Sequence, residues 1–187
     1  MGGMGGMGSM GSMGGMRRSR SGRQQPQRFD TIPNGTNVKL YGLQSAAQNN
    51  GRSGKVVGYD GSKDRYLVEL DNGETLALRG SNIQQIVKCE ITALEGSPAF
   101  NGKQALIQGW LDGSDRYEVN CGGKMVGLQK SNVILPTGTR VVVQGLSQAQ
   151  YNGLKGQIED LDRVAMRYVV KLGNGKQLKL KLENVKA

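Results

Sequence analysis

The chain of 187 residues contains no histidine, which removes the commonest general base and the commonest zinc ligand. Its two cysteines, Cys89 and Cys121, lack the spacing of metal ligands. We expect both to be core residues, with a disulfide or a reactive thiol as the alternative. The sequence also has no nucleophile elbow, phosphate-binding loop or pair of catalytic carboxylates. These absences predict a protein that is not an enzyme and that uses no cofactor, metal or small-molecule substrate.

Long apolar runs are also missing, and aromatic residues make up only 5% of the chain. No run is long enough to span a bilayer, and none resembles the apolar part of a signal peptide. We therefore expect no transmembrane segment. Nothing in the cysteine usage implies an oxidising compartment, which favours an intracellular location. Glycine, in contrast, is abundant at 30 residues, which fits short strands and many turns better than long helices.

One sequence pattern occurs three times with a period of about 50 residues. Each copy has an Asn-Gly step, followed 15 positions after the Asn by an Arg-Tyr step. The Asn-Gly steps begin at Asn50, Asn101 and Asn152. Each copy closes on a further asparagine, at Asn82, Asn132 and Asn184. A fixed period of this length indicates a row of similar structural units.

The first copy predicts five short strands. Residues 65–70 alternate between polar and apolar side chains, which is typical of a strand with one buried face. Residues 71–73, Asp-Asn-Gly, indicate a tight turn between strands. Too few residues remain for a crossover helix, so the sheet must be antiparallel and curl into a small barrel. The sequence thus predicts an all-β protein, with a disordered arm over 1–30 and barrels over 31–86, 87–135 and 136–187.

The Arg-Tyr steps have a structural interpretation. Each tyrosine begins an alternating apolar face, so we expect the rings of Tyr66, Tyr117 and Tyr168 to fill the barrels and the arginines to lie outside. An aspartate precedes the arginine in two copies, at Asp64 and Asp115, and we expect a local turn interaction between each aspartate and that arginine.

Two parts of the repeat carry a resemblance to known families. The segments 38–40 and 51–56, which return at 141–143 and 153–158, resemble the KOW motif. That motif opens SH3-like barrels in ribosomal proteins and transcription elongation factors. The longer pattern is similar to the tandem SH3-like repeats of many protist proteins. The resemblance covers about 155 residues and implies three tandem SH3-like five-stranded small barrels that act as interaction modules. Ala105 stands where the KOW pattern has glycine, which weakens the implication of nucleic-acid binding for the middle copy.

The amino-terminal arm has two parts. Residues 1–16 contain only Met, Gly and Ser and cannot bury enough surface to order themselves. Their composition is similar to that of the Gly-Met tails of ring chaperonins and the Gly-rich linkers of J-domain co-chaperones; a flexible spacer is the alternative. Residues 17–28 contain five arginines and no acid, namely Arg17, Arg18, Arg20, Arg23 and Arg28. We expect this part to contact phosphates or an acidic protein face, with a solubilising tail as the alternative.

Positive charge also gathers in the third copy. Residues 136–187 hold nine basic and four acidic residues, whereas the first two copies are nearly balanced. Lys176, Lys179 and Lys181 lie close together in the sequence, and Lys186 follows. We expect these lysines to contact a negatively charged partner, which is a protein, RNA or an anionic surface; a solvated strand face that is rich in lysine is the alternative.

The loops ahead of the Asn-Gly steps differ in sequence between the copies. On a constant scaffold, variable loops are where binding specificity usually resides. They supply two candidate partner-binding residues, Phe100 and Tyr151. Trp110 is the third candidate, because tryptophan is favoured at binding hot spots; core packing is its alternative. The sequence therefore predicts an adaptor or accessory subunit of a larger protein assembly. An RNA-binding KOW-like protein that uses the arm and the third copy is the other hypothesis.

Overall fold

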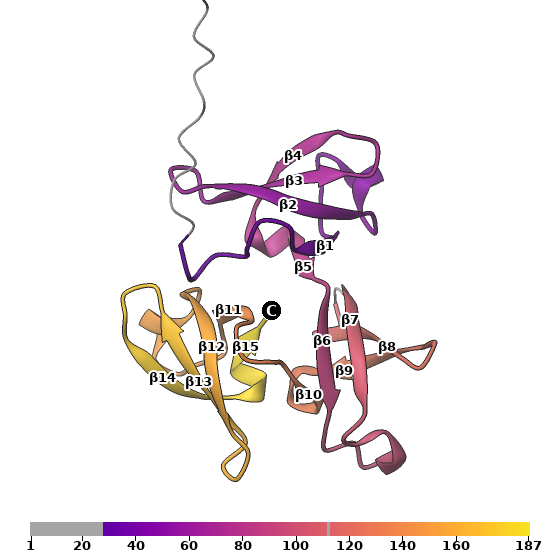
Figure 1. The fold of residues 1–187 in the computed structure, drawn as a ribbon, viewed down its shortest axis with the longest axis vertical. Coiled ribbons are helices and arrows are strands. Elements are labelled where there is room, and N and C mark those ends of the chain that lie inside the picture. Colours follow the sequence, from indigo (N-terminus) through magenta and orange to yellow (C-terminus); the bar gives the residue numbers. More distant parts are fainter. Residues whose placement is uncertain (1–27, 112) are drawn as a thin grey trace, which may run out of the picture.

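The computed structural model of this protein describes residues 28–111 and 113–187. Over these residues the chain forms three five-stranded antiparallel sheets, and helix is confined to six short 3-10 segments. Figure 1 shows the three units grouped around the carboxyl end of the chain, the first above it and the other two below. The predicted all-β architecture is confirmed. The arm over residues 1–27 lies outside the described residues.

The three units repeat one order of elements. The first unit contains β1 (Asn37–Leu40), η1 (Ala47–Asn49), β2 (Ser53–Asp60), β3 (Arg65–Leu70), β4 (Thr75–Leu78), η2 (Gly80–Asn82) and β5 (Ile83–Gln85). The second contains β6 (Val87–Ile91), η3 (Pro98–Phe100), β7 (Gln104–Leu111), β8 (Arg116–Cys121), β9 (Lys124–Gln129), η4 (Lys130–Asn132) and β10 (Val133–Ile134). The third contains β11 (Arg140–Val143), η5 (Ala149–Tyr151), β12 (Lys155–Asp162), β13 (Arg167–Leu172), β14 (Gln177–Lys181), η6 (Leu182–Asn184) and β15 (Val185–Lys186). In each sheet the first strand pairs with both the second and the last, as in the order β4-β3-β2-β1-β5.

The repeated asparagines fix the loops of the units. Asn50 Oδ1 accepts the Leu43 N–H at 2.8 Å, and Asn50 Nδ2 donates to Leu43 O at 3.0 Å. Asn101 and Asn152 clamp their loops in the same way. The closing asparagines donate to backbone carbonyls ahead of the same loops, as Asn82 Nδ2 does to Tyr41 O at 3.2 Å. The recurrence of these asparagines therefore has a structural cause.

A close approach of strands explains the glycine in the KOW-like segment. A Cβ at Gly54 would lie 2.6 Å from Val68 Cγ1, and one at Gly156 would lie 2.6 Å from a backbone oxygen of β13. The second unit has Ala105 at this place. It lies opposite Cys89 in the sheet, and Cys89 and Cys121 are smaller than the valine and leucine of the other units. Of the side chains nearest to a Cβ at Gly54, Leu70 is replaced by the smaller Cys121 but Val68 by another valine, Val119, so the cysteines relieve the more distant of the two contacts.

The predicted core residues are buried. Tyr66, Tyr117 and Tyr168 are at most 3% exposed, and Cys89 and Cys121 are buried free thiols. Both predictions are confirmed. Burial, together with the neighbouring Cys121, raises the pKa of the Cys89 thiol to about 12, so this thiol stays protonated and unreactive at neutral pH.

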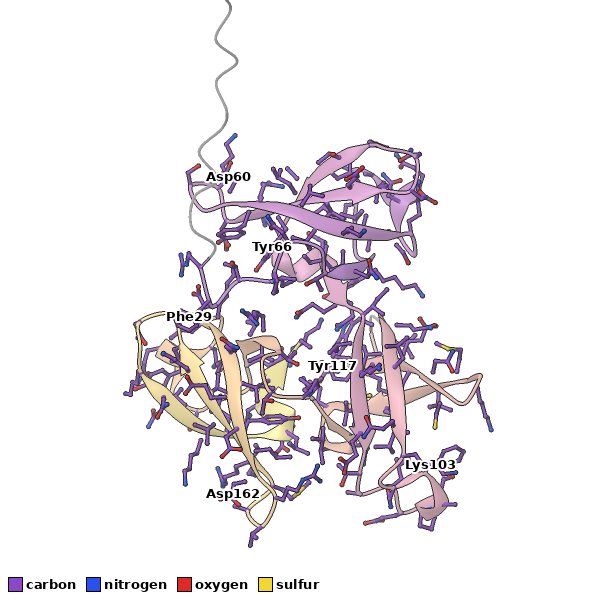
Figure 2. All side chains as sticks on the ribbon, viewed as in Figure 1. Phe29, Asp60, Tyr66, Lys103, Tyr117 and Asp162 are labelled. Atoms are coloured by element: carbon purple, nitrogen blue, oxygen red, sulfur yellow. The ribbon has the colours of Figure 1, made fainter. Side chains whose placement is uncertain are left out.

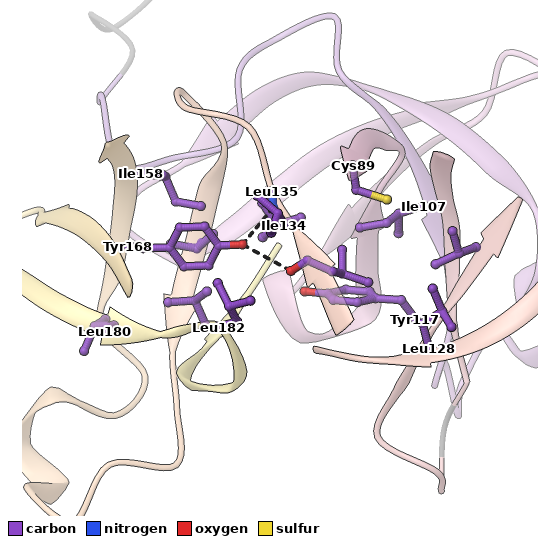
Figure 3. Close-up of a cluster of buried hydrophobic side chains, with 14 of the residues drawn as sticks. Cys89, Ile107, Tyr117, Leu128, Ile134, Leu135, Ile158, Tyr168, Leu180 and Leu182 are labelled. Carbon is purple, nitrogen blue, oxygen red and sulfur yellow. Dashed lines mark hydrogen bonds between the residues drawn. The ribbon is translucent and has the colours of Figure 1, made fainter. Parts of the chain in front are cut away.

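The second and third units share one hydrophobic core. The Leu135 N–H donates to the Tyr168 hydroxyl at 2.7 Å, and that hydroxyl donates to Val133 O at 3.2 Å. Figure 3 shows Tyr168 reaching across to this segment, with Tyr117 on its other side. In return, the Ala187 N–H donates to the Tyr117 hydroxyl at 3.0 Å. Leu135 and Ala187 hold equivalent places, three residues after the closing asparagine, so the exchange is reciprocal, as in a two-fold interface.

The first unit has a separate hydrophobic core and meets the other two through polar contacts. Lys39 Nζ lies 2.8 Å from Glu118 Oε2 of the second unit. Gln85 Nε2 donates to Arg140 O of the third at 2.7 Å. A single residue, Ile86, separates β5 from β6, so the first unit is also tied closely to the second through the chain.

Candidate functional site

The third unit carries a basic face on β13 and β14. In the register of the sheet Arg167 lies opposite Lys181, and Val169 lies opposite Lys179. Lys171 is two residues further along β13, and because alternate residues of a strand share one side, the four cations share one face. Carboxylates lie near two of them: Glu159 is 3.8 Å from Lys171 Nζ, and Glu183 is 3.4 Å from Lys181 Nζ. Among the described residues no carboxylate pairs with Arg167 or Lys179.

The predicted lysines occupy this region. Lys179 and Lys181 are exposed on the face, and Lys176 is exposed in the turn that joins its two strands. Lys186 does not lie with them, contrary to what their closeness in the sequence suggests. Its ammonium group is directed to the centre of the molecule, 2.7 Å from the Tyr41 hydroxyl.

The other two units lack two of the four cations of this face, Lys171 and Lys179, although an arginine holds the place of Arg167 in every unit and Arg79 holds that of Lys181 in the first. The position of Lys171 is taken by Glu69 in the first unit and Asn120 in the second. The position of Lys179 is taken by Ala77 and Gly127. Because the same sheet forms without these lysines, the fold does not require them, and their charge is specific to the third unit.

The root of the arm, residues 28–32, lies beside the basic face. Arg140 Nε donates to Phe29 O at 2.8 Å, and Lys171 Nζ lies 5.2 Å from the centre of the Phe29 ring. Figure 2 shows Phe29 against the strands of the third unit. Arg28 binds Asp30 with two hydrogen bonds of 2.9 and 2.6 Å, and the buried Asp30 packs on Gly173, where a Cβ would lie 2.2 Å from Asp30 Oδ2.

The position of the root brings the two predicted basic regions together. Arg28 is exposed next to the hairpin of β13 and β14. The other predicted arm residues, Arg17, Arg18, Arg20 and Arg23, lie outside the described residues. The sequence alone gives the arm and the third unit as separate basic regions, since the first and second units stand between them in the chain.

The three predicted aromatic residues are not brought together. Phe100 and Tyr151 lie at equivalent places, in η3 and η5 of different units, and Trp110 lies in β7. Trp110 is half-buried and packs edge-on against Tyr117, with 5.1 Å between ring centres.

Each of these rings is covered by a lysine ammonium group. Nζ of Lys186 lies 3.6 Å from the centre of the Trp110 ring, Nζ of Lys176 4.7 Å from that of Tyr151, and Nζ of Lys103 5.0 Å from that of Phe100. The remaining aromatic rings outside the barrel interiors, those of Phe29, Tyr41 and Tyr59, are covered by lysines too.

Asp64 and Tyr59 form a pocket that holds the ammonium group of a lysine side chain, which the sequence did not reveal. The prediction of a local pair between Asp64 and Arg65 is wrong, because Arg65 Nη1 donates to Ala77 O at 3.0 Å. The Asp64 carboxylate instead pairs with Lys155 Nζ of the third unit and accepts the Tyr59 hydroxyl at 2.5 Å. Lys155 Nζ also lies 4.8 Å from the centre of the Tyr59 ring, which adds a cation–π contact.

The second unit has a related arrangement with a lysine of its own, and the third unit lacks it. Asp115 pairs with Lys130 at 2.8 Å instead of with Arg116, and Lys130 Nζ lies 5.7 Å from the centre of the Trp110 ring. In the third unit leucine and methionine, Leu161 and Met166, replace the aromatic residue and the aspartate. The sequence signal for the pocket was that an aromatic residue and an aspartate occur together in the first and second units and are both missing from the third.

The pKa values of the pocket reflect its geometry. The hydrogen bond from Lys155, followed by that from Tyr59, lowers the pKa of Asp64. Burial alone would lower the pKa of Lys155, but its hydrogen bonds to Asp64 and Tyr59 outweigh burial and raise it. Both groups are therefore charged at neutral pH and hold the first and third units together.

No family model matches the chain, and neither does any curated protein. In residues 28–111 and 113–187 no helix is long and apolar enough to cross a membrane.

Proposed function

We propose that the protein is a non-catalytic adaptor or accessory subunit whose three units are SH3-like barrels of the KOW-like type. Its third unit and its arginine-rich arm bind one acidic surface of a protein partner. The observation that carries this proposal is the position of the arm root, where Phe29 is held between Arg140 and Lys171 at the edge of the basic face.

Charge complementarity supports the proposal. Arg167 and Lys179 have no carboxylate partner among the described residues, and Lys171 and Lys181 have only longer contacts of 3.8 and 3.4 Å. Unpaired cations on a rigid sheet raise the rate of association with a negatively charged surface and favour one orientation of docking. Arg28 adds to this charge at the same edge, and the sequence ahead of it contains four more arginines.

The aromatic residues favour a protein partner over RNA. Single-stranded RNA is commonly bound by stacking its bases on exposed aromatic rings. All nine aromatic residues of the chain lie in the described part. Three of them fill the barrels, and a lysine covers each of the other six. Stacking would require displacement of these lysines.

The proposal is tested by charge reversal on matched faces. The double variant Lys179→Glu and Lys181→Glu changes the basic face, and the double variant Lys63→Glu and Arg79→Glu makes the same change of net charge on exposed residues of the first unit. Tagged versions expressed in the native source are purified at moderate salt with and without nuclease, and the bound proteins are identified. We expect a stoichiometric protein complex that survives nuclease and is lost in the third-unit variant only.

Three outcomes contradict the proposal. Loss of all partners after nuclease assigns the basic face to RNA. Equal loss in both variants shows that net charge, and not this face, is what the partner recognises. Full retention of the complex in the third-unit variant places the binding surface elsewhere.

A further inference from the structure

A cavity of about 320 Å³ lies between the first and third units. The first unit and the arm root contribute one wall, which includes Ile32, Tyr66 and Ile83. The third unit contributes the other wall, which includes Arg140 and Val141. A volume of this size is typical of sites for small organic ligands, and it is not used by the proposed protein interaction.

The charges on the walls favour an anion. Three cations line the cavity, Arg140, Lys155 and Lys186, against one acidic side chain, that of Asp30, and the terminal carboxylate of Ala187. The Asp30 carboxylate is already bound by Arg28 through two hydrogen bonds. Lys155 and Lys186 have partners of their own in Asp64 and Tyr41, but their charges still contribute to the potential in the cavity.

Arg140 is the group that is best placed to bind the anion. Its Nε and Nη1 donate only to backbone carbonyls, of Phe29 and Gly138. No carboxylate of the described residues pairs with it, and Nη2 has no acceptor there. A partly buried guanidinium group without a counter-ion is costly, and a bound carboxylate would supply both the charge and a forked pair of acceptors.

A tyrosine hydroxyl provides a second donor. The Tyr66 hydroxyl accepts the Ile32 N–H at 3.3 Å, and among the described residues it has no acceptor for its own proton. The equivalent Tyr168 hydroxyl both accepts from Leu135 and donates to Val133. Among the described residues the Tyr117 hydroxyl, which accepts the Ala187 N–H, has no acceptor either, but of these two tyrosines only Tyr66 lines the cavity.

The rest of the walls fits an apolar group. Ile32, Ile83 and Val141 are buried aliphatic side chains of this cavity. Such walls offer no hydrogen bonds to a small inorganic anion, which needs polar partners on every side. We infer that the cavity is a binding site for a small organic carboxylate, with its carboxylate on Arg140 and the Tyr66 hydroxyl and its apolar part against the isoleucines.

Octanoate serves as the probe in the test, with octanol as the uncharged control and inorganic phosphate as the control for charge alone. Lys186 lines the cavity and covers Trp110, the single tryptophan of the chain, so fluorescence reports on binding. We expect saturable binding of octanoate with a dissociation constant of about 0.1–1 mM. Octanol and phosphate should each bind at least about tenfold more weakly, a difference of about 1.4 kcal/mol.

Variants locate the site. Arg140→Gln should weaken octanoate binding at least about tenfold, whereas Arg167→Gln, which removes a charge from the outer face, should leave it unchanged. Ser81→Phe places a ring at the cavity from an exposed position and should block binding without disturbing the cores. Because Arg140 also bonds Phe29, Arg140→Gln can disturb the arm root, and Ser81→Phe then tests the cavity without that effect. Circular dichroism checks that each variant is folded.

The inference is overturned in any of four cases. These are the absence of saturable octanoate binding, equal binding of octanol or phosphate, full binding by the folded Arg140→Gln or Ser81→Phe protein, and equal weakening by Arg167→Gln. The result is independent of the partner-capture experiment, because Ser81→Phe leaves the basic face intact.

Discussion

The joint between the second and third units differs in kind from the joint that each makes with the first unit. The second and third units bury one continuous set of apolar side chains and exchange backbone hydrogen bonds with each other's core tyrosines. The first unit keeps its own core and touches its neighbours through Lys39, Lys155 and Gln85. One sequence pattern has therefore produced two kinds of assembly.

The difference has its origin in the ends of the units. The second and third units both end in a segment that carries apolar residues past the closing asparagine, and this segment packs on the other unit. In the first unit the corresponding segment holds Gln84 and Gln85 and continues directly into β6. Burial of apolar area supplies most of the free energy of association, whereas partly exposed ion pairs contribute little. We therefore expect the second and third units to unfold together and the first unit to separate under milder conditions.

The largest effect is expected from truncating the shared core. Leu135 is 2% exposed in the cluster that spans both units, so Leu135→Ala should lower the free energy of unfolding by about 2–5 kcal/mol. Because the core is shared, hydrogen exchange measured by mass spectrometry should increase in both the second and the third units. The exchange of the first unit should change little.

Leu40→Ala is the matched control for this experiment. Leu40 is fully buried in the separate core of the first unit, and its truncation should increase exchange in that unit alone. If Leu135→Ala loosens only one of the two units, or loosens all three equally, the two joints are not different in kind.

An intermediate effect is expected from the tyrosine hydroxyls. Tyr168→Phe leaves a buried N–H of Leu135 and a buried carbonyl of Val133 without their partner, at an expected cost of about 1–3 kcal/mol. Tyr66→Phe removes one longer hydrogen bond at the wall of the cavity, where water can replace it, and should cost less than about 1 kcal/mol. Urea denaturation of the two variants measures the difference. Equal costs would show that the hydroxyl contact does not distinguish the joints.

The repeat made the fold predictable. Alternation in 65–70 and the Asn-Gly turns act over a few residues, so the strands and their antiparallel order follow from local pattern. The core place of the tyrosines followed for the same reason. The role of Asn50 and Asn82 as loop clamps was not foreseen, because their recurrence marks the positions but does not indicate which backbone groups the side chains bind.

The candidate site was less predictable because it depends on how the units pack. The lysines of β14 could be placed on one face from alternation alone, but the arm root lies beside that face because Phe29 contacts Arg140 and Lys171, more than a hundred positions away in the chain. Asp64 was assigned to its neighbour in sequence, and its partner is Lys155 in another unit. Contacts between units are fixed by tertiary packing, which no local pattern contains.

The smallest effect is expected from the ion pair between the first and third units. In a double-mutant cycle of Asp64→Asn and Lys155→Met, we expect a coupling energy of about 0.5–1 kcal/mol, since Asp64 is largely exposed. Lys155 and Tyr59 lower the pKa of Asp64 in the folded protein. A carboxylate with a lowered folded pKa stabilises the fold above its unfolded pKa, which is about 3.9, and this stability is lost as the pH falls through the folded value.

Acid should therefore loosen the first unit before it loosens the shared core of the other two. We expect hydrogen exchange of the first unit to increase, relative to that of the second and third, once the pH falls below about 4. Asp64→Asn removes the titrating group, so part of this pH dependence should disappear in the variant while the apolar joint behaves as in the parent protein. Asp60→Asn is the matched control, since Asp60 bonds only within its own turn. An unchanged pH dependence in Asp64→Asn would show that the pair with Lys155 does not hold the first unit in place.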